Sequence, residues 1–125
     1  MSKLIYEQES FQIRGACFEV YREKGAGFLE SVYQECLELE MREMDIPFVP
    51  QPRLELDYKG QKLKSEFQPD MICFGKIILE LKAIRELTDE HRSQIHNYLR
   101  VTGHRLGMLV NFGHHPRVEI ERIAN

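Results

Sequence analysis

The chain has 125 residues, 42% of them hydrophobic, so it is long enough to bury a core, and we expect one domain over residues 1–125. Its formal net charge of −3 argues against an architectural DNA-binding protein, which would need a strongly basic surface. No apolar run is long enough for a signal peptide or a membrane span, and the three cysteines lack CxxC spacing, so we expect a cytoplasmic protein with reduced thiols and no membrane partner.

Two amphipathic helices are predicted in the first 45 residues. Ser10 is the expected N-cap of the first, in which Ile13 and Cys17 belong to an apolar stripe, and the glycines of "EKGAG" end that helix near Lys24. The second helix follows Gly27 in "FLESVYQECLELEMREM", whose apolar residues fall on one side and whose charged residues fall on the other. Both helices should therefore pack against a common core.

A group of strands is predicted to follow the helices. The proline-rich stretch 47–52 disfavours helix, and three antiparallel strands are expected over about 53–58, 63–74 and 76–84, with turns at "DYKG" and "FGK". A third helix should run for fourteen residues between Thr88 as N-cap and Gly103 as the C′ residue. "GMLVNF" should then form a buried strand, and "RVEIERI" an edge strand or a cover for the sheet. The order ααβββαβ predicts an α/β fold, a small sheet with helices packed on it.

The stretch "FQPDMICFGKIILELKAI" places charges on a strand that is otherwise apolar. Glu80 and Lys82 lie two residues apart and therefore on one face, and a hairpin would bring Asp70 close to them. Burying such groups is costly unless they are paired or bound to a metal. Carboxylate oxygens suit Mg²⁺, which polarises phosphate and acidifies bound water, while Lys82 could orient that water or stabilise developing charge. The alternative is a Glu80–Lys82 salt bridge at the rim of the sheet, with Asp70 closing a turn.

Two sequence motifs resemble known proteins. Pro69 and Asp70, followed after nine residues by "ELK" at 80–82, resemble the motif of the PD-(D/E)XK nuclease superfamily. "GFLESVY" at 27–33 resembles the signature of the GxxExxY protein family, whose pattern continues in "QIHNYLRVTG" and "LVNFG". The resemblance extends from about Phe11 to Ile123. It implies a restriction-endonuclease-like core with a small mixed sheet flanked by helices, in agreement with the predicted element order.

The resemblance also implies roles for individual residues. Asp70 and Glu80 would be the principal metal ligands, and Glu30 would join them from the second helix. Lys82 would be the catalytic lysine. The implied metal is Mg²⁺, with Mn²⁺ as a substitute.

Gln94 and Tyr98 match a QxxxY element that the resemblance associates with the catalytic site. Their spacing of four residues places both on one helical face. Structural explanations remain open for several of these residues: Tyr98 and Tyr33 could be core aromatics, Glu30 a first-turn acid, and Gln94 a cap for a buried backbone group. His91 is expected to be an exposed first-turn residue.

The implied function is a Mg²⁺-dependent nuclease that hydrolyses the phosphodiester bonds of nucleic acid, with DNA as the expected substrate, through a metal-activated water. The alternative is a nucleic-acid-binding or protein-interaction module whose acidic pocket has lost catalysis. A homo-oligomer is compatible with either function. The candidate phosphate contacts are basic side chains spread over the second half of the chain: Lys76, Arg85, Arg92, Arg100 and Arg105.

Overall fold

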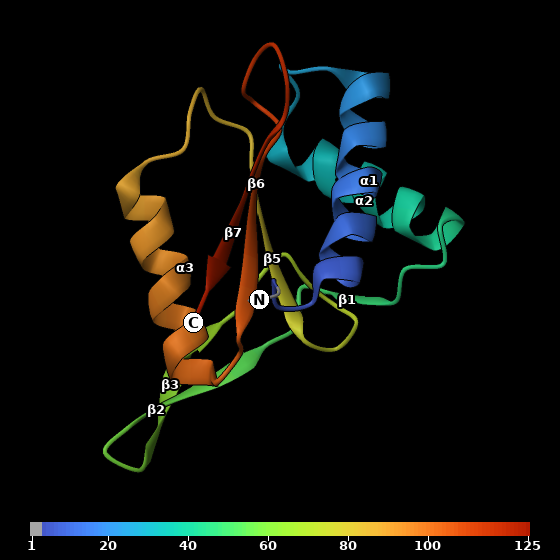
Figure 1. The fold of residues 1–125 in the computed structure, drawn as a ribbon. Coiled ribbons are helices and arrows are strands. Elements are labelled where there is room, and N and C mark those ends of the chain that lie inside the picture. The colour runs from blue at the N-terminus through green and yellow to red at the C-terminus, as the bar shows by residue number, and fades with distance from the viewer. Residues whose placement is uncertain (1–3) are drawn as a thin grey trace.

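The computed structural model describes residues 4–125, in which helices cover both faces of a five-stranded mixed sheet (Figure 1). The predicted α/β class is confirmed. The helices and strands, in chain order, are α1 (Glu7–Lys24), α2 (Glu30–Glu43), β1 (Phe48–Pro50), β2 (Leu54–Tyr58), β3 (Gln61–Phe67), β4 (Met71–Cys73), β5 (Ile77–Lys82), α3 (Asp89–Thr102), β6 (Leu106–Asn111) and β7 (Glu119–Ala124).

The main sheet has the strand order β1-β4-β5-β6-β7. The β5–β6 pair is parallel, with α3 as the crossover between them, and the other pairs are antiparallel. In the β4–β5 hairpin Met71 lies opposite Leu79. This register determines which side chains of β5 lie opposite the residues at the N-terminal end of β4.

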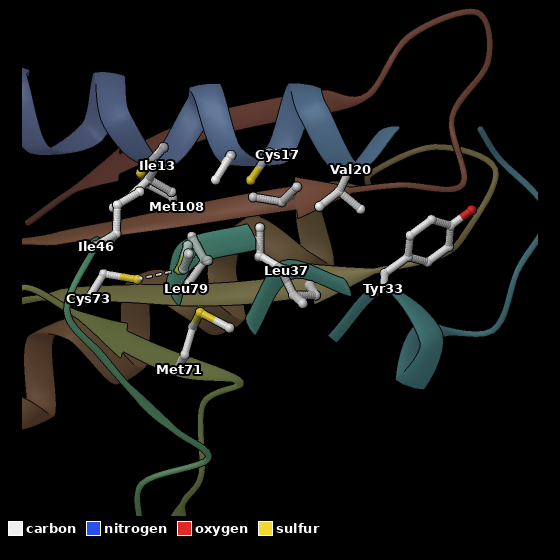
Figure 2. Packing of buried hydrophobic residues seen from close by; sticks show 14 of the residues in the cluster. Ile13, Cys17, Val20, Tyr33, Leu37, Ile46, Met71, Cys73, Leu79 and Met108 are labelled. Atoms are coloured by element: carbon white, nitrogen blue, oxygen red, sulfur yellow. Dashed lines mark hydrogen bonds between the residues drawn. The ribbon is translucent and has the colours of Figure 1, made fainter. Parts of the chain in front are cut away.

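β5 is buried on both of its faces. Leu79 and Leu81 join the larger core with α1 and α2, whereas Ile78 joins a second cluster with Ile95 and Leu99 of α3. Figure 2 shows side chains of the larger core between the helices and the sheet. Because residues two apart share a face, Glu80 and Lys82 point with Ile78 towards the α3 side.

The helices agree with the sequence prediction except at the start of α1. α3 has the predicted caps, since the Thr88 side chain accepts a hydrogen bond from the His91 backbone N–H and Gly103 is left-handed with φ 77°. The prediction of Ser10 as an N-cap was wrong. Helix α1 begins at Glu7, and the Ser10 hydroxyl donates to the Glu7 carbonyl within the first turn.

The strand predicted over 63–74 is two strands that belong to different sheets. β3 pairs only with β2 in a separate two-stranded sheet, while β4 pairs with β1 and β5. The break falls at Gln68–Asp70, where Pro69 has no N–H to donate to a continuous ladder. β1 was not predicted because of its prolines, which an edge strand tolerates. The tail does form an edge strand, β7.

No helix within residues 4–125 combines the length and the apolar character needed to cross a bilayer.

Candidate functional site

Asp70 lies directly before β4, and continuing the hairpin register by one residue puts it opposite Glu80. Its Oδ2 accepts a hydrogen bond of 2.6 Å from the Leu81 backbone N–H. Its backbone carbonyl accepts two more, from the Gln51 N–H and from Gln34 Nε2, both at 3.0 Å. Hydrogen bonds from both the sheet and α2 therefore hold Asp70 in place.

A cleft of about 240 Å³ opens beside this point, between β3, β5, β6 and α3. Four of the predicted site residues line it: Glu80, Lys82, Gln94 and Tyr98. Asp70 and Glu30 are not among its lining residues, but both lie close enough to Glu80 to influence its ionisation. The fold thus gathers residues from α2, from the segment before β4, from β5 and from α3 around the open end of the β4–β5 hairpin.

Glu80 is the most perturbed carboxylate of this group. Burial, and after it the charge of Asp70, raises its pKa to about 8, although Lys82 acts in the opposite direction. Its Oε1 atom is buried without a hydrogen-bond partner, the one such side-chain atom within residues 4–125. A buried carboxylate oxygen without a partner is costly, and a cation would remove that cost.

The neighbouring acids are perturbed in the same direction. Burial is the largest cause of the raised pKa of Asp70, although the Leu81 N–H and Lys82 both lower it. The pKa of Glu30 is raised by burial and then by Asp70, and Lys82 again opposes this. Three acids therefore interact with one another and with a single ammonium group.

Lys82 does not neutralise Glu80 directly. Within the described part of the chain, no ion pair of 4.0 Å or less joins Glu80 to Lys82, so the salt bridge considered from the sequence is not observed. Lys82 is half-buried and lines the cleft. Its ammonium group is therefore placed to meet a negatively charged ligand there.

The wall formed by α3 carries Gln94 and Tyr98. The Tyr98 ring stacks on Phe67, with centroids 3.9 Å apart and planes at 3°, so the tyrosine is also part of the smaller core. Gln94 is exposed at the mouth of the cleft. His91 lines the cleft as well, but its Nδ1 accepts a hydrogen bond from the Thr88 N–H in the helix cap. Tyr33, in contrast, is a buried core aromatic whose hydroxyl donates to the Gly25 carbonyl.

Two supporting residues were missed from the sequence. Gln34, one turn after Glu30, binds the Asp70 carbonyl. Asn111 is fully buried, and its Oδ1 accepts from the N–H groups of Ile84 and Gly113, both at 3.0 Å. The signal for Asn111 was an amide inside the apolar run "GMLVNF", whereas nothing local distinguishes Gln34.

Several candidate phosphate contacts already have partners. Arg92 binds Glu121 through two hydrogen bonds of 2.7 and 2.8 Å and also binds Asp89, while Lys76 pairs with Glu9 at 2.7 Å. Within residues 4–125, neither Arg85 nor Arg100 forms an ion pair, and both are exposed. Arg105 lies near Tyr6, away from the cleft-lining residues.

The donor set fits a hard divalent cation held by few protein ligands. Across residues 4–125, no three His, Cys, Asp or Glu side chains are gathered as a complete metal cluster. Mg²⁺ needs only one or two carboxylates and keeps several waters, and the unpartnered Oε1 of Glu80 lies near the carboxylates of Asp70 and Glu30. His91, which also lines the cleft, uses its Nδ1 atom in the cap of α3. The residues present therefore suit Mg²⁺ better than a transition metal that prefers nitrogen or sulfur.

Comparisons with known proteins agree with this fold. The chain is similar to the crystal structure of SSO0001, with 20% sequence identity and a TM-score of 0.56 over 76% of this chain and 50% of that chain. It therefore spans about half the length of that protein, and at this identity the likeness shows the fold alone. No curated protein matches the chain. The family model of the PD-(D/E)XK nuclease superfamily matches residues 7–123. The chain therefore belongs to the PD-(D/E)XK nuclease superfamily.

Proposed function

We propose that this protein is a Mg²⁺-dependent nuclease of the GxxExxY type, with DNA as its substrate. The observation that carries the proposal is the buried, unpartnered Oε1 of Glu80, next to Asp70 and Lys82 at one wall of an open cleft. Membership of a superfamily whose members typically depend on a metal supports it. The free thiols of Cys17, Cys36 and Cys73 support a reducing, cytoplasmic location.

Asp70 and Glu80 would hold the cation. Asp70 uses Oδ2 for the Leu81 N–H, so Oδ1 is its natural metal ligand, while Glu80 would contribute the buried Oε1. Glu30 would complete the acidic group from the start of α2. When bound, Mg²⁺ would supply Lewis-acid polarisation of the phosphate and would acidify water in the site; Mn²⁺ could replace it.

The remaining residues would act on the nucleic acid itself. Lys82 is the cation of the cleft wall and would stabilise the charge that develops on the phosphate oxygens during hydrolysis. Gln94, exposed at the mouth, would donate hydrogen bonds to the backbone of the bound strand. Tyr98, held flat against Phe67, would position the strand against the α3 wall.

The test is cleavage of end-labelled single- and double-stranded DNA and RNA in Mg²⁺ by the wild type and by Asp70→Asn, Lys82→Ala and Glu90→Gln. We expect DNA cleavage by the wild type, a loss of at least about a hundredfold in Asp70→Asn and Lys82→Ala, and no change in Glu90→Gln, which alters an exposed acid of α3. Cleavage that survives Asp70→Asn would identify a contaminating nuclease. Binding of DNA without any cleavage would favour the non-catalytic binding module.

A further inference from the structure

The two N-terminal helices leave an apolar groove on the side of the sheet away from the cleft. α1 and α2 cover one face of the sheet and α3 covers the other (Figure 1). The groove between α1 and α2 has a volume of about 320 Å³, and Val20, Cys36 and Leu39 form its apolar part. Leu39 is 66% exposed, so its side chain adds accessible apolar surface to the groove.

The rim of this groove is acidic. Glu19, Glu23 and Lys24 stand on the α1 side, where both glutamates are bound by Arg22, so the negative charge of that side is compensated. Glu40 and Glu43 stand on the α2 side, and neither forms an ion pair within residues 4–125. The α2 rim therefore has two uncompensated negative charges beside an exposed leucine.

The acidic rim is part of a charge division across the whole fold. Residues 7–45 carry ten acidic and four basic side chains, a formal charge of −6, whereas residues 46–125 carry ten acidic and twelve basic ones, a formal charge of +2. Most of the exposed large hydrophobic side chains also lie in the first part, among them Phe11, Phe18 and Leu39. The helical layer is thus both acidic and unusually apolar at its surface.

These charges decide which kind of partner the groove can accept. Nucleic acid and anionic lipid carry the same sign as the rim and would be repelled. A second copy related by a twofold axis would place one acidic groove against another, which costs energy for like charges. A positively charged polypeptide with an apolar side chain complements both the acidic rim and the apolar part of the groove.

We propose that the α1–α2 groove docks a basic amphipathic segment of a partner protein. An apolar side chain of that segment would pack on Leu39 and Val20, and its lysines or arginines would pair with Glu40 and Glu43. The cleft on the opposite face would stay open. Docking here would attach the chain to a basic partner while the cleft remains able to receive its own ligand.

The probe is a fluorescent synthetic peptide of about 14 residues, the length of α2, with leucines at helical i, i+4 spacing and lysines elsewhere. Two matched peptides serve as controls: one with glutamates in place of the lysines, and one with the same composition and scrambled spacing. We expect saturable 1:1 binding of the first peptide, no binding of the acidic peptide, and at least tenfold weaker binding of the scrambled one. Equal binding of the scrambled peptide would overturn the proposal, because attraction by net charge alone would then explain the binding.

Variants of the chain locate the binding surface. Leu39→Ser and the double variant Glu40→Lys/Glu43→Lys should each weaken binding by at least about tenfold. Glu90→Lys makes the same kind of charge change on α3, on the other face of the sheet, and should change the affinity less than about twofold. Equal loss in Glu90→Lys, or no loss in Leu39→Ser, would overturn the proposal. Light scattering provides an independent test: a dimer of the free chain that Leu39→Ser dissociates would show that a second copy occupies the groove, contrary to the proposal.

Discussion

Glu80 is a carboxylate in surroundings that oppose its ionisation. Its pKa, raised from 4.5 to about 8, means that the folded protein binds this proton more tightly than the unfolded chain does. The group therefore stabilises the metal-free fold fully below pH 4.5, and that contribution is lost as the pH rises through about 8. A buried carboxylate that destabilises the fold at neutral pH is understandable if a bound cation offsets the cost of burying its negative charge.

The first prediction concerns Glu80→Gln, which keeps the shape of the side chain and removes its charge. In chelator, the variant should gain stability relative to the wild type by up to about 1.4 kcal/mol per pH unit between pH 5 and pH 8, as expected for one proton. Urea unfolding across that range measures the gain, with Glu90→Gln as the exposed control. A difference that is the same at every pH would show that Glu80 is not buried as described.

The second prediction separates the structural and chemical roles of Asp70. Asp70→Ala leaves the Leu81 N–H without its acceptor, whereas the amide oxygen of Asp70→Asn can still accept that bond. In chelator, Asp70→Asn should therefore be more stable than Asp70→Ala by about 1–3 kcal/mol, the cost of an unsatisfied buried N–H group. Denaturant titration of the two variants measures this difference. Equal stability would mean that the hydrogen bond contributes nothing.

At the scale of elements, the connection from β5 to α3 is held by a short polar network. Asn111 binds the N–H groups of Ile84 and Gly113, and Glu119 of β7 accepts from Asn111 Nδ2 and from the Leu87 N–H. These bonds satisfy backbone groups that no strand pairs. They fix the segment between Lys82 and the helix that carries Gln94 and Tyr98.

The third prediction tests this close crossing at Gly113. A Cβ atom there would lie 2.3 Å from the Ile84 carbonyl oxygen, and backbone cannot move aside cheaply. Gly113→Ala should therefore cost more than about 3 kcal/mol. Gly15→Ala, within α1, is the matched control. Its Cβ atom would meet only the Met44 Cε atom, at 3.7 Å, which is an ordinary van der Waals distance. That variant should gain about 0.5–1 kcal/mol from helix propensity, and equal effects in both would contradict the described crossing.

Elements whose limits are set by nearby residues could be predicted from the sequence, whereas elements that depend on distant partners could not. The limits of α3 were predictable because Thr88 and Gly103 act within one turn of the helix. The division of residues 63–74 into β3 and β4 was not, because it depends on partners in two different sheets. Both strands have suitable composition, and only the pairing of β4 with β1 and β5 distinguishes them.

At the scale of the whole molecule, the same distinction applies to the site. The convergence of Asp70, Glu80 and Lys82 followed from the hairpin turn and the alternation of β5, which the sequence displays. Gln34 could not be found in this way, because it contacts Asp70 across 36 positions of the chain and lies on an ordinary helical turn. Its role depends on how α2 is docked, which no local pattern encodes.

The distribution of charge also changes the interpretation of the net charge. A total of −3 argued against an architectural DNA-binding protein, but the excess of acidic residues lies in the helical layer of α1 and α2. The part that carries the cleft is weakly basic and contains all five histidines. The sign of the local charge, rather than the net charge of the chain, decides where a nucleic acid can approach.

The central claim is that Asp70 and Glu80 together hold a divalent cation beside Lys82, and calorimetric titration of Mg²⁺ and Mn²⁺ into the metal-free protein tests it most directly. The wild type should bind one ion, with an affinity that increases between pH 6 and pH 8.5 as Glu80 loses its proton. Asp70→Asn and Glu80→Gln should each lose at least about tenfold in affinity, and Glu90→Gln should match the wild type. No binding by the wild type, or unchanged binding by Glu80→Gln, would contradict the claim.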